Sequence, residues 1–438
     1  MSPDLAAERA GEAVRFEKTR NPAAVRSLIG KSFVSALGSC AIFLSAMALT
    51  TNQAIAADDP VELEISGEAS VVAGVSDGDG GADADAEVRV KASTVLDNGI
   101  DVGAVLEGRL DGQQPDAIFA GGRYSGLTIG GPRGVAPATS DVYLQSAYAY
   151  ARGSFGEINV GRVEGVSRSL AVTAPTIFRA INVNDWRSDL TGLNDVHTIN
   201  DFTGYATKIT YLAPANFLGG VLGGLQMGVS YSPTLRDCGQ TLCAPEGGLA
   251  ITPDGLTLSE TSNWEDGVET ALYYQTRING DVLVGLGASY VAADEDARSV
   301  SPVFEDYEAY SIGLNLAYRG ITLGGSIKST NAGLSSLDEE NDGYLAFDAG
   351  VTFKTGDDKG DWGVMLGYGQ SEASVFGLNP IDPTLFQDTQ TAQAGFTYFL
   401  GRGVTVGAAA QFLESTRSDT LGGPEEAATV VIESSIRF

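Results

Sequence analysis

Apolar and polar positions alternate with a period of two along most of the chain from residue 61 onward. The pattern is clear where Ile312, Leu314 and Leu316 alternate with small or polar residues. Such alternation is typical of a β-strand with one apolar and one polar face. Sixteen segments of this kind predict an all-β fold. They span 61–75, 83–97, 100–111, 141–152, 155–162, 203–213, 221–232, 266–278, 280–293, 306–319, 320–330, 343–355, 360–373, 389–400, 403–415 and 427–438.

Short turns alternate with long polar connections between these segments. Asn98–Gly99, Asn279–Gly280 and Arg319–Gly320 are typical of tight hairpin turns. Short turns at one end and long loops at the other are typical of a β-barrel that spans a membrane. A soluble β-sandwich has no physical cause for this difference between its two ends. The sequence therefore predicts a 16-stranded antiparallel transmembrane β-barrel. The long connections are expected at 76–82, 112–140, 163–202, 233–265, 294–305, 331–342, 374–388 and 416–426.

The first residues have the features of an export signal. Basic residues, the last of them Lys31, precede an apolar stretch at 33–49 and the small residues Ala54–Ile55–Ala56. The apolar stretch is interrupted by Ser and Gly and is shorter than the roughly 20 residues that a membrane-spanning helix needs. We therefore expect residues 1–56 to be a signal peptide cleaved after Ala56, followed by a barrel domain at 57–438.

Charge limits the classes of partner. The chain has 438 residues, 43% of them hydrophobic and 19% charged, with a net charge of -29. Removing the six basic and four acidic residues of positions 1–56 from the 27 and 56 of the whole chain leaves 21 basic and 52 acidic residues. Nucleic-acid binding needs clustered Lys and Arg, so this balance argues against it.

Three features indicate a family. The chain ends in an alternating strand at 428–438 with a terminal Phe438, and the strand 155–162 precedes a long connection at 163–202. In these respects the chain resembles the general trimeric porins of Gram-negative bacteria, especially the alphaproteobacterial type. The resemblance implies a homotrimer in the outer membrane, in contact with lipopolysaccharide and lipid, whose water-filled channels pass small hydrophilic solutes by passive diffusion. It also implies that the barrel-assembly machinery reads Phe438 and that the loop after strand five folds inward to constrict the channel.

Charged residues of the predicted wall and loop are candidates for this constriction. Opposed basic and acidic walls orient dipolar solutes and hinder apolar ones. Arg162 shares the parity of Ile158 and Val160, so a lumenal position for it requires a bulge. The basic candidates on the wall are Arg89, Lys91, Arg109 and Arg162. The acidic candidates in the loop are Glu164, Asp185, Asp189, Asp195 and Asp201.

The sequence predicts no catalytic residue, cofactor or metal centre. The run from Asp77 to Asp85 is similar to a calcium loop but lacks the glycine and glutamate of an EF-hand at their required spacings. Acidic loops remain candidates for loosely bound divalent cations. Cys238 and Cys243 share one connection with no nearby residue to complete a zinc site, so we expect a disulfide between them.

Other functions remain open alternatives. His197 in the predicted loop could belong to a Ser–His site of a barrel enzyme, but a solvated polar residue is the simpler interpretation. An energised receptor needs a folded plug before the barrel, whereas the first strand begins close to Ala56. A substrate-selective channel on the same fold is the main alternative to a general diffusion channel.

Overall fold

The structure of the chain is a computed structural model. It describes residues 61–76, 79–111, 142–184, 189–191, 193–214, 224–235, 248–252, 255–259, 263–296, 306–331, 343–376, 384–418 and 423–438. The predictions for Ala56, Asp185, Cys238, Cys243 and the connection 112–140 lie outside these residues.

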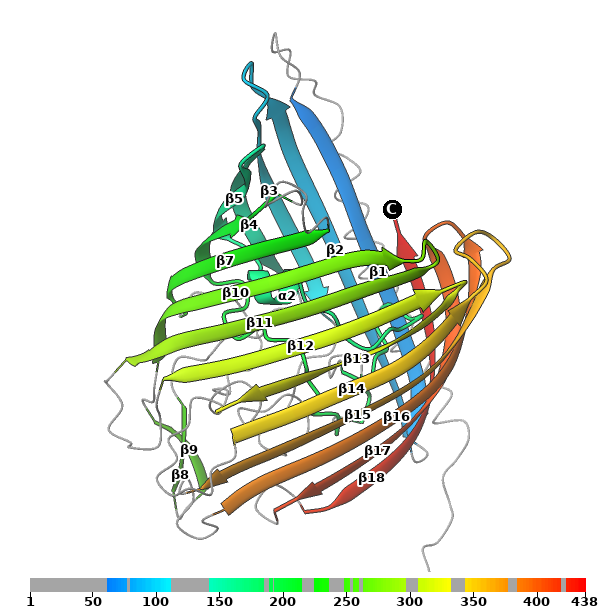
Figure 1. Ribbon diagram of the computed structural model, residues 1–438. Helices are drawn as coiled ribbons and strands as arrows, with labels where there is room; N and C mark the ends of the chain where they lie inside the picture. Colours follow the sequence, from blue (N-terminus) through cyan, green and yellow to red (C-terminus); the bar gives the residue numbers. More distant parts are fainter. Residues whose placement is uncertain are drawn as a thin grey trace, which may run out of the picture.

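Sixteen antiparallel strands close into one barrel, as the sequence predicts (Figure 1). Each strand pairs with its neighbours in the barrel, and the last strand pairs with the first. The strands of the barrel are β1 Glu62–Ser76, β2 Asp79–Val95, β3 Asp101–Asp111, β4 Val142–Gly153, β5 Gly156–Arg162, β6 Thr207–Leu212, β7 Leu225–Thr234, β10 Asn263–Ile278, β11 Val282–Asp296, β12 Tyr307–Tyr318, β13 Ile321–Thr330, β14 Gly343–Lys354, β15 Trp362–Phe376, β16 Thr384–Gly401, β17 Val404–Arg417 and β18 Glu425–Arg437.

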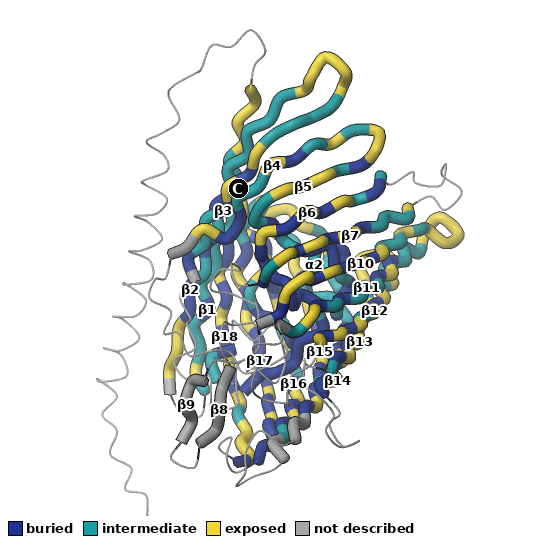
Figure 2. Tube along the Cα trace, turned by 90° about the vertical axis from the view of Figure 1, so that its left-hand side faces the viewer, coloured by how far each residue is buried: buried dark blue, intermediate teal, exposed yellow. Residues whose placement is uncertain are grey.

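The outer face of the barrel is apolar. On β12, Tyr310, Ile312 and Leu314 are 55%, 50% and 43% exposed, while the intervening Ser311 and Gly313 face inward and are less exposed. The same alternation of exposed and buried positions runs along the other strands of this side (Figure 2). This arrangement inverts that of a soluble protein and suits a barrel surrounded by lipid.

Tight turns connect strands at one end of the barrel. Asn279 and Gly280 have φ of 53° and 79°, and Arg319 and Gly320 have φ of 47° and 84°. Two successive residues in the left-handed region form the hairpin turn whose twist matches that of the flanking strands. We call this rim the short-turn end and the opposite rim the long-loop end.

Strands β1 and β18 form the closing seam of the barrel. Their register runs from Glu68 opposite Arg437 to Ser76 opposite Thr429. Beyond it, the backbones of Gly67 and Phe438 exchange two hydrogen bonds, each 3.0 Å long. The terminal residue is therefore part of the closure.

Two connections differ from the prediction. The long connection expected at 76–82 is absent, because β2 begins at Asp79 and pairs with β1 from there onward. Residues 79–85 are paired and extended, which is not the conformation of the calcium loop to which the run from Asp77 to Asp85 is similar in sequence. The connection 233–265 contains two further strands, β8 Gly248–Thr252 and β9 Gly255–Ser259, which pair only with each other. Among the described residues, no helix is long and apolar enough to cross a membrane.

Candidate functional site

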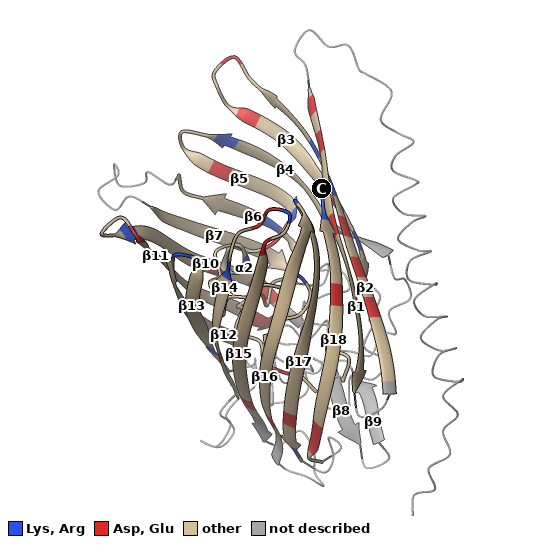
Figure 3. Ribbon diagram, turned by 90° about the vertical axis from the view of Figure 1, so that its right-hand side faces the viewer, with Lys and Arg blue, Asp and Glu red and all other residues tan. Residues whose placement is uncertain are grey.

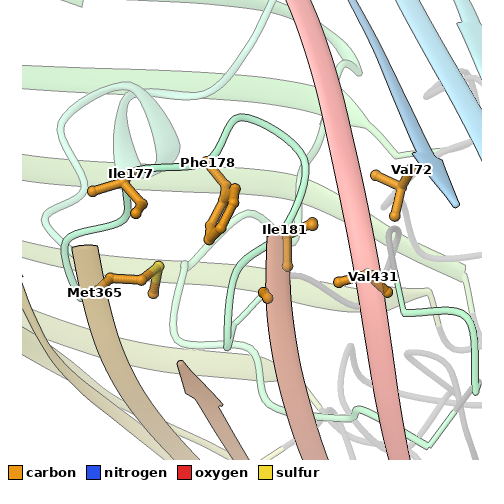
Figure 4. Close-up of a cluster of buried hydrophobic side chains, with 7 residues drawn as sticks. Val72, Ile177, Phe178, Ile181, Met365 and Val431 are labelled. Atoms are coloured by element: carbon orange, nitrogen blue, oxygen red, sulfur yellow. The ribbon is translucent and has the colours of Figure 1, made fainter. Parts of the chain in front are cut away.

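Residues 163–206, here named the inner loop, connect β5 to β6 and contact inward-facing residues of distant strands. Apart from the single helical turn α2, Val166–Ser169, the inner loop has no regular secondary structure in its described part. Phe178 and Ile181 pack with Val72 of β1, Met365 of β15 and Val431 of β18 (Figure 4). Inward apolar side chains are unusual in an aqueous barrel, and here they form a small core with the inner loop.

Glycines of two neighbouring strands make room for this core. A Cβ atom at Gly395 of β16 or at Gly407 of β17 would collide with the ring of Phe178. The aromatic ring therefore lies directly against the backbone of the barrel wall. This close approach fixes the position of the inner loop on the side of the barrel formed by β15–β18.

Buried carboxylates hold the backbone of the inner loop at several points. Glu433 of β18 accepts hydrogen bonds from the N–H groups of Arg179, Ala180 and Ile181 at 3.1, 2.8 and 3.2 Å. The carboxylate thus satisfies three donors that an irregular buried segment cannot pair internally. A hydrogen bond to a charged group contributes about 1.5–3 kcal/mol. Glu433 is the largest single anchor at this end of the inner loop.

A second carboxylate anchors two separate parts of the inner loop. Asp348 of β14 accepts hydrogen bonds from the N–H of Ala174 at 3.1 Å, the amide of Asn184 at 2.7 Å and the hydroxyl of Thr198 at 2.8 Å. It also accepts a hydrogen bond from the hydroxyl of Ser326 at 2.8 Å. One wall residue therefore connects positions that lie 24 residues apart in the chain.

Further anchors come from β10, β13 and β14. The N–H of Ser167 donates to Glu269 at 3.0 Å, next to Lys208, whose Nζ is 3.8 Å from the same carboxylate. Lys328 donates to the carbonyl of Ile199 at 3.0 Å. Tyr344 donates its hydroxyl hydrogen to the carbonyl of Asp195 at 2.7 Å and accepts from the N–H of His197 at 2.8 Å. These contacts hold the inner loop against the wall along most of its length.

A buried histidine and aspartate lie at the centre of the inner loop. His197 Nε2 is 2.7 Å from Asp201, and Arg168 donates to the other oxygen of that carboxylate at 2.9 Å. Burial lowers the pKa of His197, and Asp201 raises it by less. Burial would raise the pKa of Asp201, but His197, Arg168 and Lys328 outweigh it and lower the pKa below its ordinary value. The neutral imidazole therefore donates to an ionised carboxylate. The solvated position expected of His197 is wrong, because its side chain is buried within the inner loop.

Acid is expected to loosen the inner loop at this contact. The pKa of docked His197 lies below its ordinary value of 6.5, so protons favour the undocked state. The stabilisation is fully present above about pH 6.5 and is lost as the pH falls below it. Hydrogen–deuterium exchange of residues 163–206 should accelerate between about pH 7 and pH 5, after correction for the intrinsic rate. His197→Gln keeps a donor but cannot be protonated, and the same acceleration in this variant would refute the assignment.

A polar cavity separates the inner loop from the opposite wall. It has a volume of about 510 Å³ and is lined by six carboxylates and four arginines. A second cavity of about 250 Å³ shares Arg89, Tyr148 and Glu157 with the first. The charged residues of the larger cavity are Glu68, Asp85, Glu87, Arg89, Glu107, Arg109 and Glu157 from the wall and Glu164, Arg168 and Arg179 from the inner loop.

The structure places the predicted basic residues at different positions. Arg89 and Arg109 line the larger cavity, and Lys91 lines the smaller one. Arg162 pairs with Ala147 and Thr207 in an uninterrupted register and lines neither cavity. The predicted bulge and lumenal position of Arg162 are therefore not found.

The predicted acidic residues of the loop are also divided. Glu164 lines the larger cavity. Asp189, Asp195 and Asp201 are instead 3%, 0% and 2% exposed, and the carboxylate of Asp189 accepts hydrogen bonds from within the loop. These three residues are buried in the inner loop and line neither of the two cavities. The cavity has both signs of charge on both sides, in place of the opposed basic and acidic walls that the sequence predicts.

Several important residues escape the sequence pattern. Arg168 and Arg179 contribute positive charge from the loop that was expected to be acidic. Glu433 and Asp348 occupy polar positions of predicted strands, and nothing in the alternation distinguishes an anchor from a solvated wall residue. The sequence does contain one sign of the docked loop, which is that Val431 and Met365 occupy inward positions. An apolar residue among the polar residues that face the lumen indicates that another segment of the chain packs on it.

The fold resembles solved outer-membrane proteins. Salmonella typhi OmpF, in complex with daunomycin, aligns with a TM-score of 0.54 and 15% identity over 87% of this chain and 99% of that one. The outer membrane channel DcaP of Acinetobacter baumannii aligns with a TM-score of 0.51 and 11% identity over 86% and 97% of the two chains. At this identity the likeness concerns the fold alone. No curated protein matches the sequence.

A family model described as Gram-negative porin matches residues 44–418. The match covers most of the chain, and the closed barrel with its apolar outer face and polar interior agrees with it. The protein is an outer-membrane channel for passive diffusion, and the chain belongs to the Gram-negative porin family.

Proposed function

We propose that the inner loop constricts the channel and confines diffusion to the side formed by β1–β6. The observation that carries the proposal is the set of anchors from Glu269, Asp348 and Glu433, which hold the loop against the other side of the barrel. The two polar cavities lie on the side that remains. Small hydrophilic solutes and ions pass there without chemical change, and apolar solutes are hindered because the lining is charged.

The constriction is proposed to be weakly cation-selective. The larger cavity has two more carboxylates than arginines, and the chain after position 56 has 31 more acidic than basic residues. An acidic passage concentrates cations and depletes anions, and salt screens this effect.

Ion selectivity tests this assignment. In planar bilayers under a KCl gradient, the reversal potential should indicate a preference for K⁺ that fades when both solutions are raised from about 0.1 M to about 1 M, as the Debye length falls from about 10 Å to about 3 Å. Glu87→Gln in the cavity should lower the preference. Glu426→Gln on the exposed outer face of β18 is the matched control and should leave it unchanged. Anion preference, or equal effects of both variants, would contradict the proposed pathway.

The same recordings separate a general channel from a substrate-selective one. A general diffusion channel gives a current that small sugars reduce only through solution viscosity. A substrate-selective channel contains a site that one class of solute saturates and blocks. Saturable block by a single solute class would replace the general function with the selective one.

The assembly and its partners are proposed from the family resemblance. A homotrimer is the expected oligomer, and lipopolysaccharide and outer-membrane lipid are expected around it. Acidic loops are candidates for loosely bound divalent cations that bridge the chain to anionic lipid. The alphaproteobacterial type and the disulfide between Cys238 and Cys243 stay predictions.

A further inference from the structure

The charge of the inward-facing side chains of β2 changes sign once along the strand. Asp83, Asp85 and Glu87 occupy successive inward positions, and Arg89 and Lys91 follow at the next two. Strand β2 runs from the long-loop end, where it follows β1, to the short-turn end at Asn98–Gly99. The acidic residues therefore lie nearer the long-loop end and the basic ones nearer the short-turn end. Figure 3 shows the acidic residues along β1 and β2 beside β18.

The two cavities have the same difference in charge. Arg89 and Glu157 line both and do not distinguish them. Among the other lining residues, the larger cavity has five carboxylates against three arginines. The smaller one has Lys91 and Arg152 against Glu64. Formal charge thus changes from negative to positive where the cavities meet.

Ion pairs occur in both cavities. In the larger one, Arg168 is 2.6 Å from Glu164 and Arg179 is 3.5 Å from Glu68. In the smaller one, Lys91 is 3.6 Å from Glu64 and Arg152 is 2.6 Å from Glu157. Each pair cancels one charge of each sign, so the net charge of neither lining changes. At the junction, by contrast, Arg89 donates a hydrogen bond of 2.7 Å to the hydroxyl of Tyr148, which is a neutral group. The guanidinium of Arg89 therefore keeps its charge facing the passage.

We propose that this porin has a bipolar passage, with an acidic section toward the long-loop end in series with a basic section toward the short-turn end. Arg89, Lys91 and Glu87 are its specificity-determining residues. The inference rests on the proposed constriction, because the inner loop is what brings permeating ions close to β1–β6.

Bipolarity has a direct electrical consequence. A field directed from the long-loop end to the short-turn end drives cations in through the acidic section and anions in through the basic section. Both ions accumulate at the junction and conduct. The opposite field draws both away and depletes the junction, so the current is smaller. A dipolar solute is held lengthwise, with its cationic group toward the long-loop end.

Current–voltage curves of the full-length protein, inserted into planar bilayers from one side, test the proposal. In about 0.1 M KCl the currents at equal and opposite voltages should differ by roughly 1.5-fold. In about 1 M KCl they should become nearly equal, because salt screens the electrostatic potential of the charged residues in each section. The larger current should flow when the long-loop side is positive. Equal currents at both polarities in dilute salt would overturn the proposal.

Two variants with opposite effects on selectivity make the test specific. Arg89→Gln with Lys91→Gln leaves an acidic passage, which should lose the asymmetry and become more cation-selective. Glu87→Gln with Asp85→Asn should also reduce the asymmetry but lower cation selectivity. Glu426→Gln should change neither property. If the current asymmetry persists in both double variants, it arises at the channel mouths, and the bipolar passage is refuted. If shortening the inner loop leaves the conductance unchanged, only the proposed constriction is refuted.

Discussion

Shortening the inner loop between Arg168 and Asp201 is expected to raise the single-channel conductance at least about twofold and to admit larger sugars. The described residues of this segment pair with no barrel strand, so the wall is expected to stay closed. The anchors Glu433, Asp348 and Lys328 then face water in the widened lumen, where solvation replaces the lost hydrogen bonds. Conductance and liposome swelling with sugars of graded size measure the effect.

The matched control is a deletion of equal length in the connection between β7 and β10. This deletion also shortens a loop at the same end of the barrel, but it leaves the inner loop and its anchors in place. Conductance should then stay close to that of the unmodified protein. If shortening the inner loop changes neither conductance nor size exclusion, residues 163–206 do not define the narrowest part of the channel.

Deleting Phe438, or replacing it with Asp, is expected to lower the amount of assembled barrel in the outer membrane several-fold. The backbone of Phe438 makes two hydrogen bonds to Gly67, and its ring packs close to that residue on the seam. The deletion removes these contacts together with the terminal signal that the family resemblance implies. Phe438 is 51% exposed on the outer surface of the barrel, so a charge in place of its ring would lie in contact with lipid.

Heat-modifiable mobility of the barrel on gels of isolated outer membranes measures this outcome. Phe438→Tyr keeps the backbone pairing and the aromatic ring, so it should assemble normally. Normal levels of the Phe438→Asp variant would show that neither the seam nor the signal depends on this residue.

The barrel could be predicted from the sequence because one physical rule governs most of it. A strand between lipid and water must alternate, and β12 at 307–318 agrees with the expected 306–319 to within one residue. The connection at 76–82 failed for a related reason. Its Asp and Gly residues are typical of loops, yet residues 79–82 pair with β1 in a continuous register, because small and polar residues are also acceptable in a strand that faces the lumen at every second position.

The inner loop was only partly predictable. Its length and its place after β5 follow from the family resemblance, but the roles of its acidic residues depend on contacts that are distant in sequence. Asp201 interacts with Arg168, which is 33 residues away, and Asp348 of the wall reaches both Ala174 and Thr198. No local pattern distinguishes such a structural carboxylate from one that faces the passage, such as Glu164.

The anchor at Glu433 also sets an order of events during biogenesis. It joins the inner loop at Arg179 to the final strand across 254 residues of sequence, one of the longest separations in the fold. The loop cannot reach its final position until β18 has arrived, because Val431 and Glu433 are part of the surface that receives it. We therefore expect the loop to complete its docking only in the last stage of assembly, because a barrel that still lacks β18 has neither Val431 nor Glu433 to receive it.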